Sequence, residues 1–140
     1  MKRFLFLAVA LVSGLVLGGC FPGTGGVGLG EEFTLSTGES AAIKGEDLEI
    51  TFLEVLEDSR CPKNVTCIWE GRATSLVQVS INGDSENLEL IEPGLTYQPT
   101  SQTYKNYRIS FYLLPYPEEG RQVTPADYRL VLTVSELTEQ

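Results

Sequence analysis

Apolar and polar residues alternate with a period of two in several short segments of the chain. Successive side chains of a β-strand point to opposite faces of a sheet, so this alternation predicts half-buried strands. The clearest segments are residues 48–55, 73–81, 88–90, 107–113 and 128–134, with shorter candidates at 33–36 and 40–44. No window shows a convincing helical period, although residues 124–127 could form a single turn.

Two local signals refine this pattern. The apolar phase slips between Phe52 and Leu53, which predicts a β-bulge at that point. Asn82-Gly83 lies between two alternating segments, and this pair favours a tight hairpin turn because both of its residues adopt positive φ readily. The residues that follow, 84–86, either lengthen the turn or extend a strand.

The pattern as a whole predicts an all-β fold. About seven short strands separated by turn residues are typical of a single antiparallel β-sandwich or a small barrel. An immunoglobulin-like sandwich is one candidate topology, because Asp127-Tyr128 stands at the start of a late strand, where a tyrosine corner has its Tyr.

The N-terminal residues have the features of an export signal. Lys2 and Arg3 precede an apolar segment, residues 4–17, that is shorter than the ~20 residues a membrane-spanning helix needs. The tetrapeptide Leu17-Gly18-Gly19-Cys20 resembles the lipobox of bacterial lipoproteins. That resemblance implies cleavage before Cys20 and lipidation of its thiol. A transmembrane helix and a plain secretory signal are the alternatives.

These features predict three parts: a lipoprotein signal peptide at residues 1–19, lipidated Cys20 with a glycine-rich tether at 20–30, and a β-domain at 31–140. The expected location is the bacterial cell envelope. Phe21 is not the Asp that holds many enteric lipoproteins in the inner membrane. The anchor is therefore expected in the outer membrane if the host has one, and otherwise on the outer face of the cell membrane.

Composition narrows the range of functions. The chain has 10 Lys and Arg, 19 Asp and Glu, and no His, with a net charge of −9. Loss of Lys2 and Arg3 with the signal peptide changes the mature charge to −11. This negative charge argues against nucleic-acid binding, because the phosphate backbone binds basic surfaces. The absence of His removes Ser-His-Asp and Cys-His catalysis and His-containing zinc sites.

Cys61 and Cys67 remain after Cys20 is assigned to lipid. Exported proteins fold in an oxidising space, so we expect a disulfide between them. A loop this small stabilises the fold by roughly 2 kcal/mol in the chain-entropy model. A free thiol pair, a metal site or a redox centre are weaker alternatives, because no His is present and the spacing is not Cys-x-x-Cys.

The segment around these cysteines reads DSRCPKNVTCIWEGRA and follows the strand LEITFLEVLE. It resembles an uncharacterised family of bacterial exported proteins that share a D-S-R-C-P, C-x-W-x-G motif in a small β-domain. The resemblance extends from about Phe33 to Glu136. It implies the β fold and the disulfide but no activity.

The motif has a structural interpretation. Asp58 and Arg60 are placed to pair or to bond loop backbone groups, and Pro62 stiffens the loop. Trp69 is expected to pack across the disulfide as a core aromatic, and Gly71 lets the chain turn into the next strand. The alternative is functional: a rigid loop that serves as an epitope for a partner, since rigidity lowers the entropic cost of binding.

Two further groups of residues have ordinary interpretations. The tyrosines of residues 97–116 are expected to pack across strands, with an exposed platform for peptide or glycan as the alternative. The acidic groups are expected to be solvated strand edges, since residues 82–86, which most resemble a calcium-binding loop, lack the later Gly and the bidentate Glu of an EF-hand. We therefore assign no catalytic, metal-binding or cofactor-binding residue.

The function expected from the sequence is a non-enzymatic binding or structural role for a lipid-anchored envelope β-domain. Expected partners are the membrane, through the lipid, and an envelope protein or glycan. One alternative is a protease inhibitor that presents the Cys61–Cys67 loop. Another is a small hydrolase that uses carboxylates, which requires a pocket and a carboxylate of raised pKa.

Overall fold

The computed structural model describes residues 26–138. The predicted signal peptide and Cys20 lie outside these residues, as does the first part of the tether. In the described part of the chain, no helix has the length and hydrophobicity needed to cross a membrane.

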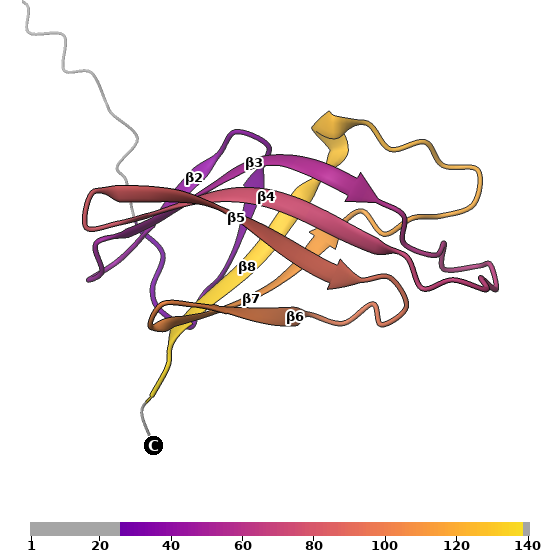
Figure 1. Ribbon diagram of the computed structural model, residues 1–140. Helices are drawn as coiled ribbons and strands as arrows, with labels where there is room; N and C mark the ends of the chain where they lie inside the picture. Colours follow the sequence, from indigo (N-terminus) through magenta and orange to yellow (C-terminus); the bar gives the residue numbers. More distant parts are fainter. Residues whose placement is uncertain (1–25, 139–140) are drawn as a thin grey trace, which may run out of the picture.

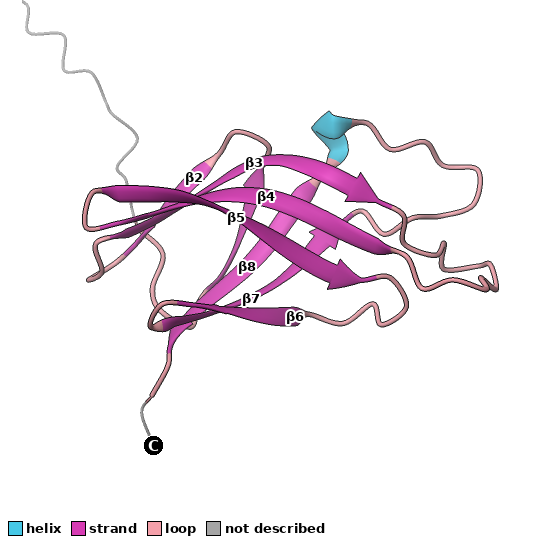
Figure 2. Ribbon diagram, viewed as in Figure 1, coloured by secondary structure: helices cyan, strands magenta, loops and turns pink. Residues whose placement is uncertain are grey.

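Eight strands form two antiparallel sheets of four strands each. Figures 1 and 2 show how these strands are arranged in space. The first sheet has the order β1-β8-β7-β6 and the second has the order β2-β3-β4-β5. The bounds are β1 Glu32–Ser36, β2 Ser40–Ile43, β3 Leu48–Asp58, β4 Arg72–Ile81, β5 Asp84–Pro93, β6 Thr100–Tyr104, β7 Tyr107–Leu114 and β8 Arg129–Glu136. The fold is thus an all-β sandwich, as predicted, and its two sheets do not close into a barrel.

The core lies between the two sheets. Alternate residues of each strand point into it, and the largest fully buried side chains are Phe52 and Phe111, which belong to opposite sheets. The remaining core residues are mainly Ile, Leu and Val from β3, β4, β7 and β8. This arrangement is the reason for the period-two pattern in the sequence, because each strand buries only one face.

The turn and bulge predictions are confirmed. Asn82 and Gly83 have φ of 52° and 84°, and they join β4 directly to β5. Residues 84–86 therefore extend a strand rather than lengthen the turn. The register of β3 against β4 shifts between Phe52 and Glu54, where a bulge was expected.

Strand β6 was not predicted from the sequence. Its residues, TSQTY, show no apolar alternation because β6 is an edge strand of its sheet and none of its side chains is fully buried. A tight turn at Lys105, with φ of 50°, pairs it with β7. Edge strands of this kind need little hydrophobic signal, since their backbone pairing supplies the contact.

The sandwich has two distinct ends. The loops of residues 59–71, 94–99 and 115–128 lie together at one end (Figure 1), which we call the loop end. The described chain begins at the other end, where Val27 bridges to Ile43 beside the start of β3. The 11 residues of β3 span roughly 35 Å between the two ends.

Candidate functional site: the disulfide loop and its arginine anchor

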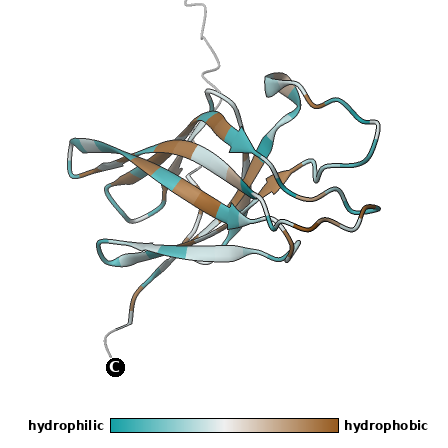
Figure 3. Cartoon of the chain, turned by 45° about the vertical axis from the view of Figure 1, so that its right-hand side comes forward, coloured by the Kyte–Doolittle hydropathy of each residue, from teal (hydrophilic) through white to brown (hydrophobic). Residues whose placement is uncertain are grey.

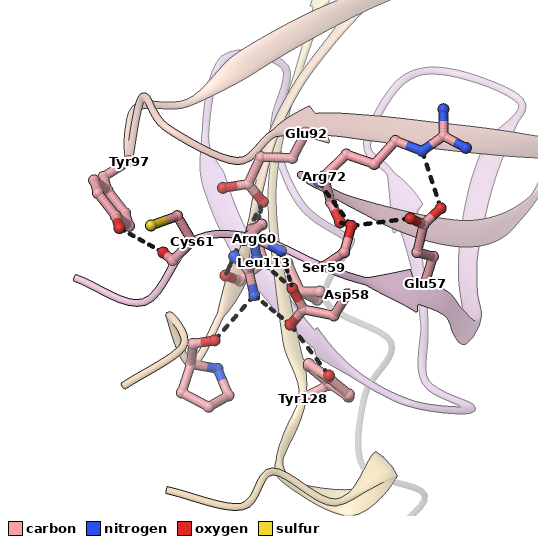
Figure 4. Close-up of polar contacts among 11 residues, drawn as sticks. Glu57, Asp58, Ser59, Arg60, Cys61, Arg72, Glu92, Tyr97, Leu113 and Tyr128 are labelled. Atoms are coloured by element: carbon pink, nitrogen blue, oxygen red, sulfur yellow. Dashed lines mark hydrogen bonds and ion pairs between the residues drawn. The ribbon is translucent and has the colours of Figure 1, made fainter. Parts of the chain in front are cut away.

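Arg60 lies at the base of the loop and is only 4% exposed. Its Nε and Nη2 donate to the two carboxylate oxygens of Asp58, each at 2.8 Å (Figure 4). Its Nη1 donates to the carbonyl of Leu113 at 2.7 Å, and Nη2 also donates to the carbonyl of Pro115 at 3.0 Å. A planar guanidinium can hold several acceptors in fixed directions, so these bonds fix the start of the loop against β7.

Glu92 of β5 completes the buried network. It is 2% exposed, and its Oε2 accepts from the backbone N–H of Leu113 at 2.8 Å and from Arg60 Nη1 at 3.5 Å. Burial raises the pKa of Glu92, although the Leu113 N–H and the charge of Arg60 act in the opposite direction. Glu92 is therefore bonded mainly to the β7 backbone, whereas Arg60 is paired mainly with Asp58.

The electrostatics of Arg60 agree with this assignment. Burial by itself would lower the pKa of Arg60, but the hydrogen bond and negative charge of Asp58 raise it overall. Asp58 also accepts from the hydroxyl of Tyr128 at 3.2 Å. Burial, together with Asp58, raises the pKa of Tyr128 to about 12. Asp58 and Arg60 thus pair as predicted, and in the described residues no buried side-chain nitrogen or oxygen lacks a partner.

The role of Tyr128 differs from the sequence-based expectation. In a tyrosine corner the hydroxyl bonds to backbone a few residues upstream. Here it reaches the Asp58 carboxylate, 70 residues away in the chain. The Asp127-Tyr128 pair is therefore not a tyrosine corner, and this feature gives no support to an immunoglobulin-like topology.

The disulfide predicted between Cys61 and Cys67 is present, with the two sulfurs bonded and a Cα–Cα distance of 6.0 Å. Cys61 is buried and its carbonyl accepts from the hydroxyl of Tyr97 at 2.6 Å. Tyr97 packs edge-on against Tyr116, with ring centroids 5.3 Å apart. Lys63 Nζ lies 4.7 Å from the Tyr116 centroid, a cation–π distance. The loop is thus held to both neighbouring loops of the loop end.

Two glycines allow these loops to approach closely. Gly71 has φ of 66°, and a Cβ there would lie 1.8 Å from the carbonyl oxygen of Ser59. A Cβ on Gly94 would lie 2.1 Å from the carbonyl oxygen of Glu70. Gly71 was predicted from the motif, whereas Gly94 gave no sequence signal because its neighbour is distant in the chain.

The prediction for Trp69 is wrong. Its side chain is 62% exposed, and the adjacent Ile68 is 96% exposed. Both residues follow Cys67 in a segment without regular structure that leads to β4. An aromatic residue does contact Cys61, but it is Tyr97 of the neighbouring loop, whose hydroxyl donates to the Cys61 carbonyl. The loop therefore presents its two largest apolar side chains to solvent.

The tyrosines of residues 97–116 lie in two kinds of place, and the carboxylates do not gather into a metal site in the described residues. Tyr97 and Tyr116 pack against each other in loops rather than across strands. Tyr104 and Tyr107, on paired strands, bond to carboxylates of Glu86 and Glu46. Among the residues that the structure covers, no group of three or more Asp, Glu or Cys side chains is arranged to hold a metal ion.

A cavity of about 480 Å³ lies elsewhere, between β1 and β2, and is lined by both apolar residues, such as Phe33 and Leu35, and polar ones, such as Ser40 and Glu49. Glu39 also lines it, but a hydrogen bond from the Ser36 backbone lowers the pKa of this carboxyl. Glu92, which has a raised pKa, is buried at the loop end instead. Glu92 does not line this cavity, so its raised pKa and the cavity do not combine into the site that the hydrolase alternative requires.

Comparisons of the chain with protein-family models, with curated proteins and with solved structures find no match. The resemblance to a family of exported proteins therefore stays a prediction. The site itself is defined by the geometry alone: an exposed apolar pair, Ile68 and Trp69, that follows a disulfide-closed ring, with a buried ionic network at the residue before that ring.

Proposed function

We propose that this protein is a non-enzymatic binding module of the bacterial envelope whose recognition element is the loop of residues 61–71. One observation carries the proposal. Ile68 and Trp69 are exposed, yet they directly follow Cys67, which a disulfide links to Cys61, and Arg60 and Cys61 are hydrogen-bonded to neighbouring parts of the fold.

Rigidity and exposure together favour binding. A loop that is already ordered loses little conformational entropy when a partner docks. Tryptophan is enriched at the energetic centres of protein interfaces because it buries a large area with few rotatable bonds. A purely structural loop gains nothing from exposing these side chains to water, where each forgoes its burial free energy.

The membrane anchor is a second part of the proposal. Lipidation of Cys20 would attach the chain six residues before Gly26, at the end of the sandwich opposite the loop end. The loop would then point away from the membrane that holds the anchor. Mass spectrometry of the protein purified from its host tests this directly. Acyl chains on an N-terminal Cys20 are expected, and an unmodified thiol within an uncleaved chain would refute the anchor.

Site-specific photo-crosslinking tests the loop as the recognition element. A photoreactive residue replaces Ile68 in one variant and Asn106, in the turn between β6 and β7 at the opposite end, in the other. Both are made in living cells in the intact chain. Discrete adducts are expected from position 68 and not from position 106. Equal patterns from the two positions, or none from either, would contradict the proposal.

Protease inhibition is a second candidate, because residues 63–66, inside the ring closed by the Cys61–Cys67 disulfide, are exposed and could occupy a protease cleft. This candidate predicts that inhibition disappears when the Cys61–Cys67 disulfide is reduced. A panel of envelope proteases that are all unaffected by the intact protein would eliminate it. The outcome leaves the wider binding role in place, since the partner need not be a protease.

A further inference from the structure

The exposed large apolar side chains are not spread evenly over the described part of the molecule. Six of the seven lie in the loops of the loop end or on the strands that enter it, whereas Leu29 is near the other end. Figure 3 shows hydrophobic segments on these loops and on the neighbouring strands. We call these six residues the apolar end: Leu56, Val65, Ile68, Trp69, Ile91 and Leu95.

The sheet surface beside the apolar end is acidic. Cross-strand pairing places Glu54 and Glu89 on either side of Leu76, on the face that points away from the core. Strands β3, β4 and β5 contain no Lys and only one Arg, Arg72. That arginine is already paired with Glu57 at 3.0 Å. Glu70, next to Trp69, is also exposed.

From this combination we infer the chemistry of the partner: a cationic, amphipathic segment of another protein, whose apolar side covers Ile68 and Trp69 and whose Lys or Arg side chains lie beside Glu54, Glu70 and Glu89. This inference rests on the proposed function and adds the partner's charge to it. Complementary charge around an apolar centre gives specificity and speeds association.

The same charges disfavour two other occupants. Anionic lipid headgroups are repelled by a carboxylate-rich surface. A second copy of this chain related by two-fold symmetry would place its own carboxylates opposite these. A basic protein segment is not repelled by these carboxylates.

Trp69 is the only tryptophan of the chain, so its fluorescence reports on this surface alone. The intact protein is placed in phosphatidylcholine nanodiscs and titrated with an 18-residue amphipathic helical peptide of Leu and Lys. A peptide with Glu in place of each Lys is the control. The Lys peptide is expected to shift Trp69 emission to the blue and to protect it from acrylamide. We also expect the Kd to rise at least tenfold between 50 and 300 mM NaCl, because the attraction is electrostatic.

Variants separate the apolar and the charged contributions. Glu54→Lys with Glu89→Lys is expected to weaken binding at least tenfold. Asp47→Lys with Asp84→Lys, at the opposite end, makes the same change in net charge and is expected to have little effect. Ile68→Ser is also expected to weaken binding tenfold, and its exposure means that the fold tolerates the change.

Four results would overturn the inference: equal binding of the Glu peptide, equal loss in both charge variants, quenching of Trp69 by brominated lipid without peptide, or self-association in sedimentation. If crosslinking from position 68 succeeds while the Lys peptide fails to bind, the loop's role stands and the cationic partner is refuted. If crosslinking fails as well, the proposed function falls with it.

Discussion

Arg60→Met tests whether the buried network holds the loop in place. Methionine is nearly as long as arginine but apolar, so Asp58 and Glu92 lose their buried cation and two backbone carbonyls lose a donor. Removing one partner of a buried ion pair costs about 3–5 kcal/mol. The whole free energy of unfolding is only about 5–15 kcal/mol. For a domain of this size the expected fall in Tm is on the order of 10–20 °C.

The pH dependence of the stability lost in Arg60→Met shows whether the unpaired Glu92 carboxylate is the cause. The pKa of Glu92 is already raised in the folded protein, and Arg60 is one of the groups that limits the rise. Without Arg60 the folded-state pKa of Glu92 moves further above its unfolded value. A group raised in this way contributes stability that is present below the unfolded pKa and lost as pH rises through the folded pKa. The difference in free energy of unfolding between the unmodified protein and Arg60→Met is therefore smallest near pH 4 and grows toward pH 7.

Urea unfolding followed by far-ultraviolet circular dichroism measures both effects, since the exposed Trp69 is a poor reporter of folding. Arg72→Met is the matched control, because the Arg72–Glu57 pair is solvent-exposed and such pairs contribute at most about 1 kcal/mol. Adding Glu92→Gln to Arg60→Met is expected to restore part of the loss at pH 7. The reasoning is refuted if Arg60→Met costs no more than Arg72→Met, or if its deficit does not change with pH.

Three other predictions follow from the same geometry. Gly71→Ala is expected to prevent the native loop from forming, whereas Gly83→Ala, with positive φ but open space, costs only ~1–2 kcal/mol by chemical denaturation. Replacing Cys61 and Cys67 together with serine lowers stability by about 2 kcal/mol and speeds proteolysis within the loop. Because the pKa of Tyr128 is raised to about 12, the contribution of its hydroxyl to the free energy of unfolding is complete below pH 10 and is lost as pH rises toward 12. Tyr128→Phe is expected to reduce this alkaline loss of stability in a pH series of thermal melts.

The fold was largely predictable because each sandwich strand buries one face, which leaves a period-two signal in the sequence. The bulge after Phe52 was predictable from a slip in that same period-two signal, and the Asn82-Gly83 turn was predictable because both residues adopt positive φ readily. Strand β6 was missed because an edge strand with polar residues leaves no such signal. Its existence depends on pairing with β7, which a local pattern does not record.

The site was predictable only where it is local in the chain. Asp58 and Arg60 are two residues apart, so their closeness in the chain suggested that pair, and Cys61 and Cys67 were the two cysteines left once Cys20 was assigned to lipid. Glu92 and Tyr97 approach the loop from 32 and 36 residues away, and nothing near them in the sequence marks that contact. The error at Trp69 came from treating its size as evidence of burial, although a large apolar residue in a loop is also typical of an interface.

The position of the ionic network is itself an argument for function. Apolar side chains in place of a buried ion pair often stabilise a protein as well or better, so stability alone does not explain Arg60. Apolar packing does not require defined bond angles, whereas the hydrogen bonds of a guanidinium do. Arg60 bonds to β3 through Asp58 and to the end of β7 through Leu113, which joins the two sheets at the residue before Cys61. A network of this kind fixes where the loop begins, and its position at the base of the one segment that exposes Ile68 and Trp69 supports a role in which the orientation of that segment matters.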